Sequence, residues 1–121
     1  MARILSIEDD PDIQRLIGAT LFPEGYEMHY AFNGQEGFEK VLLVDPDVIL
    51  LDMMIPILSG IDLLKRLKGR KETQRIPVIV LTAFGDEGGM LQKSVMALGA
   101  DDYLRKPVMI DEVIARVKQV L

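Results

Sequence analysis

The most informative stretch of the sequence is Val48-Ile49-Leu50-Leu51-Asp52, in which four consecutive apolar residues end in one acid. A short run that is apolar throughout and contains β-branched residues is typical of a strand covered on both faces. The run Val78-Ile79-Val80-Leu81 repeats this pattern, and Thr82 follows it. Two such strands predict a parallel sheet between helical layers, with polar side chains where the strands end.

Apolar runs of similar length occur five times, and a helical pattern follows each of them. The predicted strands are Arg3–Ile7, Tyr26–Ala31, Val48–Leu51, Pro77–Leu81 and Asp102–Leu104. Tyr26–Ala31 mixes polar and apolar residues, as edge strands do. Five strand–helix units predict an α/β domain whose ligands bind beyond the carboxyl ends of the strands.

The helices between the strands carry start and stop signals. Asp10 before Pro11 predicts an N-cap and a first helical position. Pro23 and Gly25 predict the end of this helix, and its predicted apolar face holds Ile13, Leu16, Ile17 and Leu21. The other predicted helices are Gln35–Val44, about Ile61–Lys68, about Gly89–Leu98 before a C′ glycine at Gly99, and Ile110–Leu121.

The composition is that of one ordinary globular domain. The chain has 121 residues, of which 49% are apolar and 27% are charged. The absence of cysteine excludes disulfides and thiolate metal sites. The net charge of −5 disfavours a nucleic-acid binder, which needs a basic surface. The first apolar segment is too short for a signal peptide or a membrane span, so we expect a cytoplasmic protein without nucleic-acid or membrane partners.

Chemically reactive side chains follow four of the predicted strands. In chain order they are Glu8, Asp9 and Asp10, then Asp52, then Thr82 and Ala83, and finally Arg105, Lys106 and Pro107. Because parallel strands share one carboxyl edge, we expect these side chains to meet there.

The acids in this set predict a cation site. Two like charges about 4 Å apart repel by about 4 kcal/mol at an effective dielectric constant of about 20. A cluster of Glu8, Asp9 and Asp52 is therefore tolerable with a divalent cation, and ligands that are all oxygen favour Mg²⁺. A carboxylate can accept a phosphoryl group as an acyl phosphate, whose oxygens the Lys106 ammonium and the Thr82 hydroxyl would hold.

Together and in this order, these residues resemble those of the receiver domains of bacterial response regulators, and the resemblance covers the whole chain. It implies a flavodoxin-like (βα)5 fold with strand order 2-1-3-4-5, forming a single receiver domain over residues 1–121 without an output domain. It implies a phosphoacceptor switch of two-component signal transduction rather than a conventional enzyme. Such a module catalyses its own Mg²⁺-dependent phosphorylation and dephosphorylation, and Mn²⁺ is a plausible substitute for Mg²⁺.

The resemblance also implies roles for individual residues. Asp52 is the expected phosphoacceptor, and the expected metal site consists of Glu8 through water, Asp9, Asp52 and the backbone carbonyl of Met54. The expected phosphoryl-stabilising residues are Thr82, Ala83 and Lys106. The expected switch pair is Thr82 and Tyr103, Pro107 is expected after a cis peptide bond, and Pro56 and Gly60 match the turn after the phosphoacceptor.

The resemblance implies two kinds of protein partner. A sensor histidine kinase or a histidine phosphotransfer protein is expected to supply the phosphoryl group. A downstream target is expected to bind the face formed by the fourth helix, fifth strand and fifth helix.

Alternative interpretations remain for single residues and for the function. Asp10 is expected to be only a helix cap, outside the metal site. An aspartate-nucleophile phosphohydrolase of the haloacid-dehalogenase type would need a second Asp where Met54 stands. A flavin-binding electron carrier would need Ser, Thr and Gly where the sequence has Glu8-Asp9-Asp10. A receiver without phosphoacceptor chemistry is disfavoured by the complete set of acceptor, metal ligands and lysine.

Overall fold

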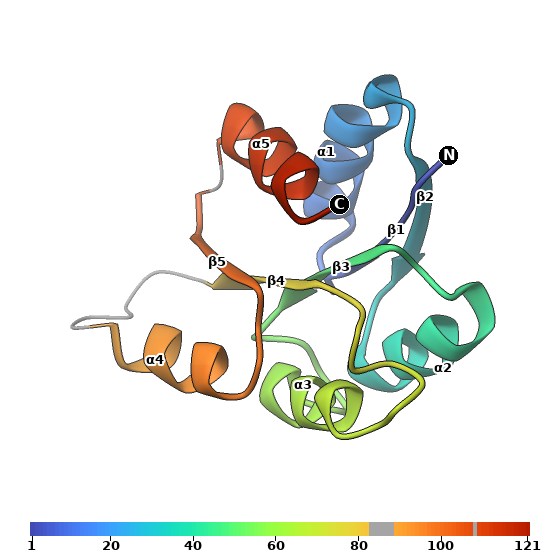
Figure 1. The fold of residues 1–121 in the computed structure, drawn as a ribbon. Coiled ribbons are helices and arrows are strands. Elements are labelled where there is room, and N and C mark those ends of the chain that lie inside the picture. Colours follow the sequence, from blue (N-terminus) through green and yellow to red (C-terminus); the bar gives the residue numbers. More distant parts are fainter. Residues whose placement is uncertain (83–88, 108) are drawn as a thin grey trace.

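The computed structural model describes residues 1–82, 89–107 and 109–121, with only the backbone of Thr82. The described strands are β1 (Arg3–Ile7), β2 (Glu27–Ala31), β3 (Val48–Asp52), β4 (Val78–Thr82) and β5 (Asp102–Arg105). They form one parallel sheet in the order β2-β1-β3-β4-β5 (Figure 1). The predicted fold class and strand order are confirmed.

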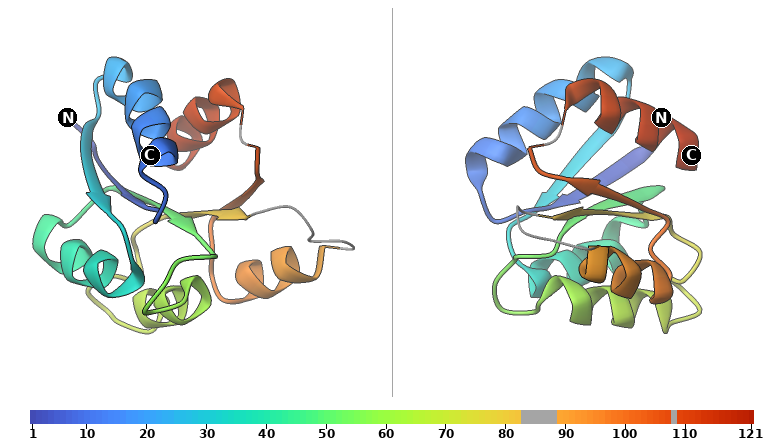
Figure 2. Two further views of the ribbon diagram at one scale, coloured as in Figure 1. Left: turned by 180° about the vertical axis from the view of Figure 1, so that it is seen from behind. Right: turned by 90° about the vertical axis from the view of Figure 1, so that its left-hand side faces the viewer.

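Helices cover both faces of this sheet. The described helices are α1 (Pro11–Leu21), α2 (Gly34–Val44), α3 (Gly60–Lys68), α4 (Met90–Ala97) and α5 (Ile110–Val120). Helices α1 and α5 lie on one face, and α2, α3 and α4 lie on the other, as Figures 1 and 2 show from three directions. None of the helices in the described ranges has the length and apolar content that crossing a bilayer requires.

The predicted strand limits differ from the observed ones by at most one residue, but the differences matter for the site. Asp52 and Thr82 are the last residues of β3 and β4 rather than the first residues after them. Their backbones are therefore held in the sheet ladder, where Asp52 pairs with Leu81 and Thr82 pairs with Arg105.

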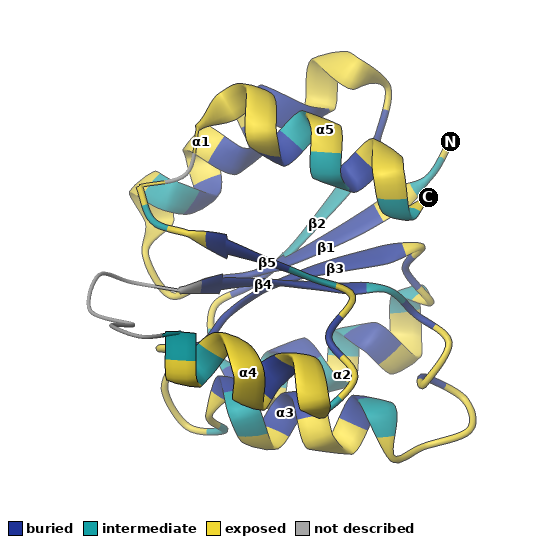
Figure 3. Ribbon diagram, turned by 60° about the vertical axis from the view of Figure 1, so that its left-hand side comes forward, coloured by how far each residue is buried: buried dark blue, intermediate teal, exposed yellow. Residues whose placement is uncertain are grey.

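Successive strand residues pack into opposite core layers, because side chains alternate in direction along a strand. In β3, Ile49 and Leu51 pack on the α2–α4 side, whereas Val48 and Leu50 pack on the α1–α5 side. All residues of β3 are buried, and Figure 3 shows burial running through the central strands. The edge strand β2 is mostly half-buried, as its mixed sequence predicted.

Side-chain caps begin three of the helices, as short polar side chains do at helix N-termini. The capping oxygens of Asp10, Asn33 and Ser59 accept the N–H groups of Asp12, Glu36 and Asp62 at 2.8, 2.8 and 3.2 Å. The predicted Asp10 cap is thus confirmed. After α1 the chain adds a 3₁₀ turn, η1 (Phe22–Glu24), which the sequence did not predict. Gly25 closes that turn with a positive φ of 92°, donating its N–H to Phe22.

The predicted apolar face of α1 is only partly buried. Leu16 is 51% exposed, whereas Ile17 and Leu21 are buried against the sheet. Leu16 instead lines an open apolar cavity of about 400 Å³ between α1 and α5. Leu16 therefore lies on the apolar face that its spacing predicts, beside Ile13 and Ile17 in the same cavity, and it stays exposed because helical spacing does not reveal how closely two neighbouring helices approach.

Gly34, the first residue of α2, lies against the loop that follows β3. A Cβ at this position would lie 1.8 Å from the carbonyl oxygen of Leu58, and the Gly34 N–H donates to Pro56 at 3.2 Å. We expect Gly34→Ala to lower the free energy of unfolding by about 1–3 kcal/mol, because helix and loop must separate to admit the methyl group. Urea unfolding measures this. The adjacent exposed variant Gln35→Ala should change it by about 0.5 kcal/mol at most. Wild-type stability of Gly34→Ala would contradict the close approach.

Candidate functional site

The carboxyl ends of β1, β3 and β5 bring four charged side chains together. Glu8 and Asp9 follow β1, Asp52 ends β3, and Lys106 directly follows β5. Because β1 pairs in parallel with β3, the acids at the carboxyl ends of these two strands become neighbours. One carboxylate oxygen from each of Glu8, Asp9 and Asp52 lies within 4.8 Å of the other two. We call these three residues the acidic cluster.

Lys106 bridges two members of the acidic cluster. Its Nζ lies 3.2 Å from both carboxylate oxygens of Glu8 and 3.1 Å from Oδ2 of Asp52. The Glu8 and Asp52 side chains are only 1% and 3% exposed, whereas Asp9 lies at the surface. Ionic contacts this well shielded from water are screened little by salt, so each strongly affects the protonation of the others.

The pKa of each buried group reflects these contacts. Burial raises the pKa of Glu8 to about 8, and its hydrogen bond to Asp52 and the charge of Asp52 act in the same direction, against Lys106. Burial alone would raise the pKa of Asp52, but hydrogen bonds with Glu8, the Met54 N–H and Lys106 together lower it. Burial would lower the pKa of Lys106, but its contacts with Asp52 and Glu8 raise it. Of the two acids, Glu8 is therefore the one that keeps a proton more readily, while Asp52 is the one that ionises more readily beside the Lys106 ammonium.

The Asp52 carboxylate is held at both oxygens. Oδ1 accepts the backbone N–H of Met54 at 3.1 Å, and Oδ2 contacts Lys106. The Met54 side chain is 71% exposed, so this residue meets the site through its backbone. A carboxylate that is ionised, oriented and next to an ammonium group can act as a nucleophile toward a phosphoryl group.

Of the other predicted site residues, the structure describes some and leaves others outside its described part. Asp10 caps α1, the role predicted for it. The Lys106–Pro107 peptide bond is cis, the conformation expected there. Tyr103 is 8% exposed and packs in the core layer on the α2–α4 side. The Thr82 side chain and all of Ala83 lie outside the described part of the chain.

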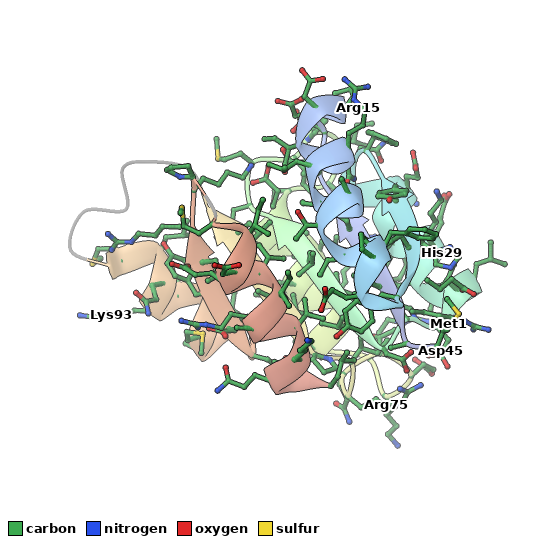
Figure 4. The ribbon with its side chains drawn as sticks, turned by 90° about the horizontal axis from the view of Figure 1, so that it is seen from above. Met1, Arg15, His29, Asp45, Arg75 and Lys93 are labelled. Atoms are coloured by element: carbon green, nitrogen blue, oxygen red, sulfur yellow. The ribbon has the colours of Figure 1, made fainter. Side chains whose placement is uncertain are left out.

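The donor set of the acidic cluster fits Mg²⁺. Glu8, Asp9 and Asp52 offer carboxylate oxygens, the ligands that Mg²⁺ prefers over nitrogen or sulfur. The one histidine of the chain, His29, lies on β2 and pairs with Glu27 at 2.7 Å, on the β2 side of the molecule in Figure 4. Within the described residues, no group of three or more His, Cys, Asp or Glu side chains other than this cluster is placed to hold a metal.

The sequence interpretation overlooked Gln14, which contacts the backbone of the site. Its side chain is 3% exposed and its Nε2 reaches the carbonyl oxygen of Glu8 at 3.2 Å. A signal was present: Gln14 lies three residues before Ile17, on the apolar face of α1, where an unpaired amide would be costly.

Comparison with known families gives a match over nearly the whole chain. The profile described as response regulator receiver domain matches residues 4–118. The phosphate regulon transcriptional regulatory protein PhoB of Pseudomonas aeruginosa is 42% identical over 118 residues, which cover 98% of this chain and 51% of PhoB. The chain spans about half the length of the curated relatives it matches.

Solved structures agree with this match. The receiver domain of the Francisella response regulator 1452 has a TM-score of 0.88 and 35% identity, covering 99% of this chain and 96% of that one. The receiver domain of the sensor histidine kinase PA1611 of Pseudomonas aeruginosa has a TM-score of 0.87 and 28% identity, covering 98% and 95%. That structure is described with a magnesium ion coordinated in its active-site cleft.

Proposed function

This chain belongs to the response regulator receiver domain family, whose function is to accept a phosphoryl group in two-component signalling, and we propose that Asp52 is its acceptor. The observation that carries the proposal is the contact of Lys106 with buried Asp52 and Glu8, beside Asp9. This arrangement combines an ionised nucleophile, a fixed ammonium group and oxygen ligands for a cation at one strand edge.

In the proposed reaction, a carboxylate oxygen of Asp52 attacks the phosphorus atom of the donor. A new oxygen–phosphorus bond forms as the bond between phosphorus and the donor's leaving group breaks, and the electron pair leaves with that group. The Met54 N–H orients the carboxylate, and Lys106 faces the oxygens of the transferred group. When bound, Mg²⁺ supplies further charge neutralisation to those oxygens. The proposed ligands are Asp9, Asp52, the Met54 carbonyl and, through water, Glu8.

The remaining roles complete the proposal. Thr82 and the backbone of Ala83 hold the transferred phosphoryl group, and Thr82 with Tyr103 forms the switch. The module catalyses its own phosphorylation and dephosphorylation, and Mn²⁺ substitutes for Mg²⁺. Residues 1–121 act as one receiver unit in the cytoplasm.

A histidine kinase or histidine phosphotransfer protein is the proposed donor, and a downstream protein binds the face of α4, β5 and α5. Two features of that face support its proposed role in binding a downstream protein. Met90 and Met96 expose apolar side chains on α4, and Arg116 of α5 pairs with Asp102 of β5 at 2.6 Å. The ion pair couples β5 to α5, and exposed methionines suit an adaptable apolar contact.

A labelling experiment tests the proposed function. The protein is incubated with acetyl phosphate, with Mg²⁺ or with excess EDTA, and its intact mass is measured. We expect the mass of one phosphoryl group to be added with Mg²⁺, and no addition with EDTA. Mn²⁺ in place of Mg²⁺ should restore the addition. An unlabelled protein in Mg²⁺, or equal labelling in EDTA, would contradict the proposal.

A further inference from the structure

We propose that Gln14 is a positioning residue for the acidic cluster. Through the backbone of Glu8, it fixes the direction from which the Glu8 and Asp9 side chains reach a cation. This inference rests on the proposed function of the cluster as a Mg²⁺ site and adds a residue that makes no contact with the cation.

The geometry around Gln14 is a three-way contact at the ends of two strands. Its Nε2 lies 2.9 Å from the carbonyl oxygen of Ser6, 3.2 Å from that of Glu8 and 3.0 Å from that of Ala31. The first two belong to β1 and the residue after it, and the third ends β2. Because an amide nitrogen carries two hydrogens, at least one of them is shared between two of these oxygens. The Gln14 side chain on α1 therefore connects the end of β1, where Glu8 and Asp9 of the acidic cluster follow, with the end of β2.

The position is buried enough to make these bonds important. Gln14 is 3% exposed, and one turn later Gly18 lies so close to the Tyr30 side chain of β2 that a Cβ there would be 2.2 Å from the Tyr30 hydroxyl. A buried amide without partners costs about 1–3 kcal/mol, so the donors need these carbonyls. The orientation of the amide is also fixed, since a flipped Gln14 would point its oxygen at three other oxygens.

The contact with Glu8 links this packing to the site. The Glu8 carbonyl belongs to the peptide group that joins Glu8 to Asp9, and β1 has already ended at Ile7. The Glu8 N–H is held at 3.0 Å by Ala31, the same residue whose carbonyl Gln14 contacts. Without Gln14, the Glu8–Asp9 peptide group would lose a donor that the sheet does not replace, and both side chains would lose a fixed starting direction.

The test compares Gln14→Met with Thr20→Val. Methionine keeps the length of the side chain but removes its donors. Thr20 is also a buried residue of α1, but within the described residues its hydroxyl donates locally, to Leu16 at 2.8 Å. Both variants remove a buried hydrogen-bond donor from α1, but only Gln14→Met removes a donor to the Glu8 carbonyl oxygen. The Mg²⁺ dissociation constant is measured by titration, stability by urea unfolding, and the labelling rate as a function of Mg²⁺ concentration.

We expect Gln14→Met to raise the Mg²⁺ dissociation constant about tenfold, the effect typical of residues that orient metal ligands, and Thr20→Val to change it less than about twofold. Because Gln14 does not contact Asp52 or Lys106 in the described structure, the labelling rate of Gln14→Met should return close to wild type at saturating Mg²⁺. An unchanged dissociation constant, or equal weakening in Thr20→Val, would overturn the proposal. If Gln14→Met does not fold, Gln14→Asn, one methylene too short for all three carbonyls, carries the same expectations.

A measurement without metal separates this inference from the function it rests on. The carbonyl ¹³C shift of Glu8 and the amide ¹⁵N shift of Asp9 report on the hydrogen bond to their shared peptide group. Both should change in metal-free Gln14→Met and remain unchanged in Thr20→Val. If wild type binds no Mg²⁺, the proposed function fails even when these shifts change. If the shifts do not change, the positioning role of Gln14 fails, whatever the affinity for Mg²⁺.

Discussion

Asp52→Asn should lower phosphoryl labelling by acetyl phosphate about a hundredfold or more, the largest effect expected of any single substitution in the chain. The substitution is nearly isosteric, so the fold around β3 should persist. An amide oxygen is a far weaker nucleophile than an ionised carboxylate, and an amide also loses the ionic contact that Lys106 makes at 3.1 Å. Labelling is followed by intact mass over time in Mg²⁺.

The control for this variant is Asp62→Asn. Asp62 is an exposed acid in the first turn of α3, so the chemical change is the same at a site without Lys106. This control should label at the wild-type rate. Labelling of Asp52→Asn at the wild-type rate would show that another residue accepts the phosphoryl group, and peptide mapping after reductive trapping of the acyl phosphate would identify it.

Metal-free protein should lose stability as the pH rises from about 5 to 8, and Glu8→Gln should remove this loss. The pKa of Glu8 is about 8 in the folded protein, against 4.5 for a glutamate side chain in water. Below pH 4.5 the Glu8 carboxyl is protonated in both the folded and the unfolded protein. Between pH 4.5 and about 8 it is protonated only in the folded protein. Unfolding then releases a proton, so each step up in pH favours the unfolded chain.

The expected size of this effect is about 3 kcal/mol between pH 5 and 8, from about 1.36 kcal/mol per pH unit over most of the interval. Asp52 acts in a different window, because its folded pKa is lowered: its contribution is present above its unfolded value of 3.8 and is lost only as the pH falls below it. Lys106, whose pKa is raised above 10.5, stays charged throughout.

Urea unfolding at several pH values, with EDTA present, measures this effect. Glutamine resembles the protonated form of Glu8, so the variant should be more stable than wild type at pH 8 and close to it at pH 5. Glu39→Gln, which changes an exposed acid of α2, should keep the wild-type slope. Saturating Mg²⁺ should flatten the wild-type slope, because a bound cation offsets the charge of ionised Glu8. A Glu8→Gln slope equal to wild type would refute the assignment of the proton.

Much of the fold followed from local patterns. The fully apolar runs ending at Leu51 and Leu81 predicted central strands, because a strand covered on both faces is apolar throughout. The mixture of polar and apolar residues in β2 predicted an edge strand. The Asp10 cap was equally local. The sequence also predicted that four charged residues lie close together, because the carboxyl ends of parallel strands lie at one edge of the sheet. These residues are Glu8, Asp9, Asp52 and Lys106.

Other features depend on distances that no local pattern contains. Lys106 meets Glu8 from 98 positions away and Asp52 from 54, so which acid keeps a proton follows from burial and contacts made only in the folded chain. The exposure of Leu16 depends on the gap between α1 and α5, and the close approach at Gly34 on how α2 meets the loop after β3. The residues that make up the site could be predicted from the sequence because the carboxyl ends of the parallel strands lie at one edge of the sheet. Its protonation and the support from Gln14 were decided by tertiary packing, because desolvation and hydrogen-bond distances exist only once separate segments exclude water together.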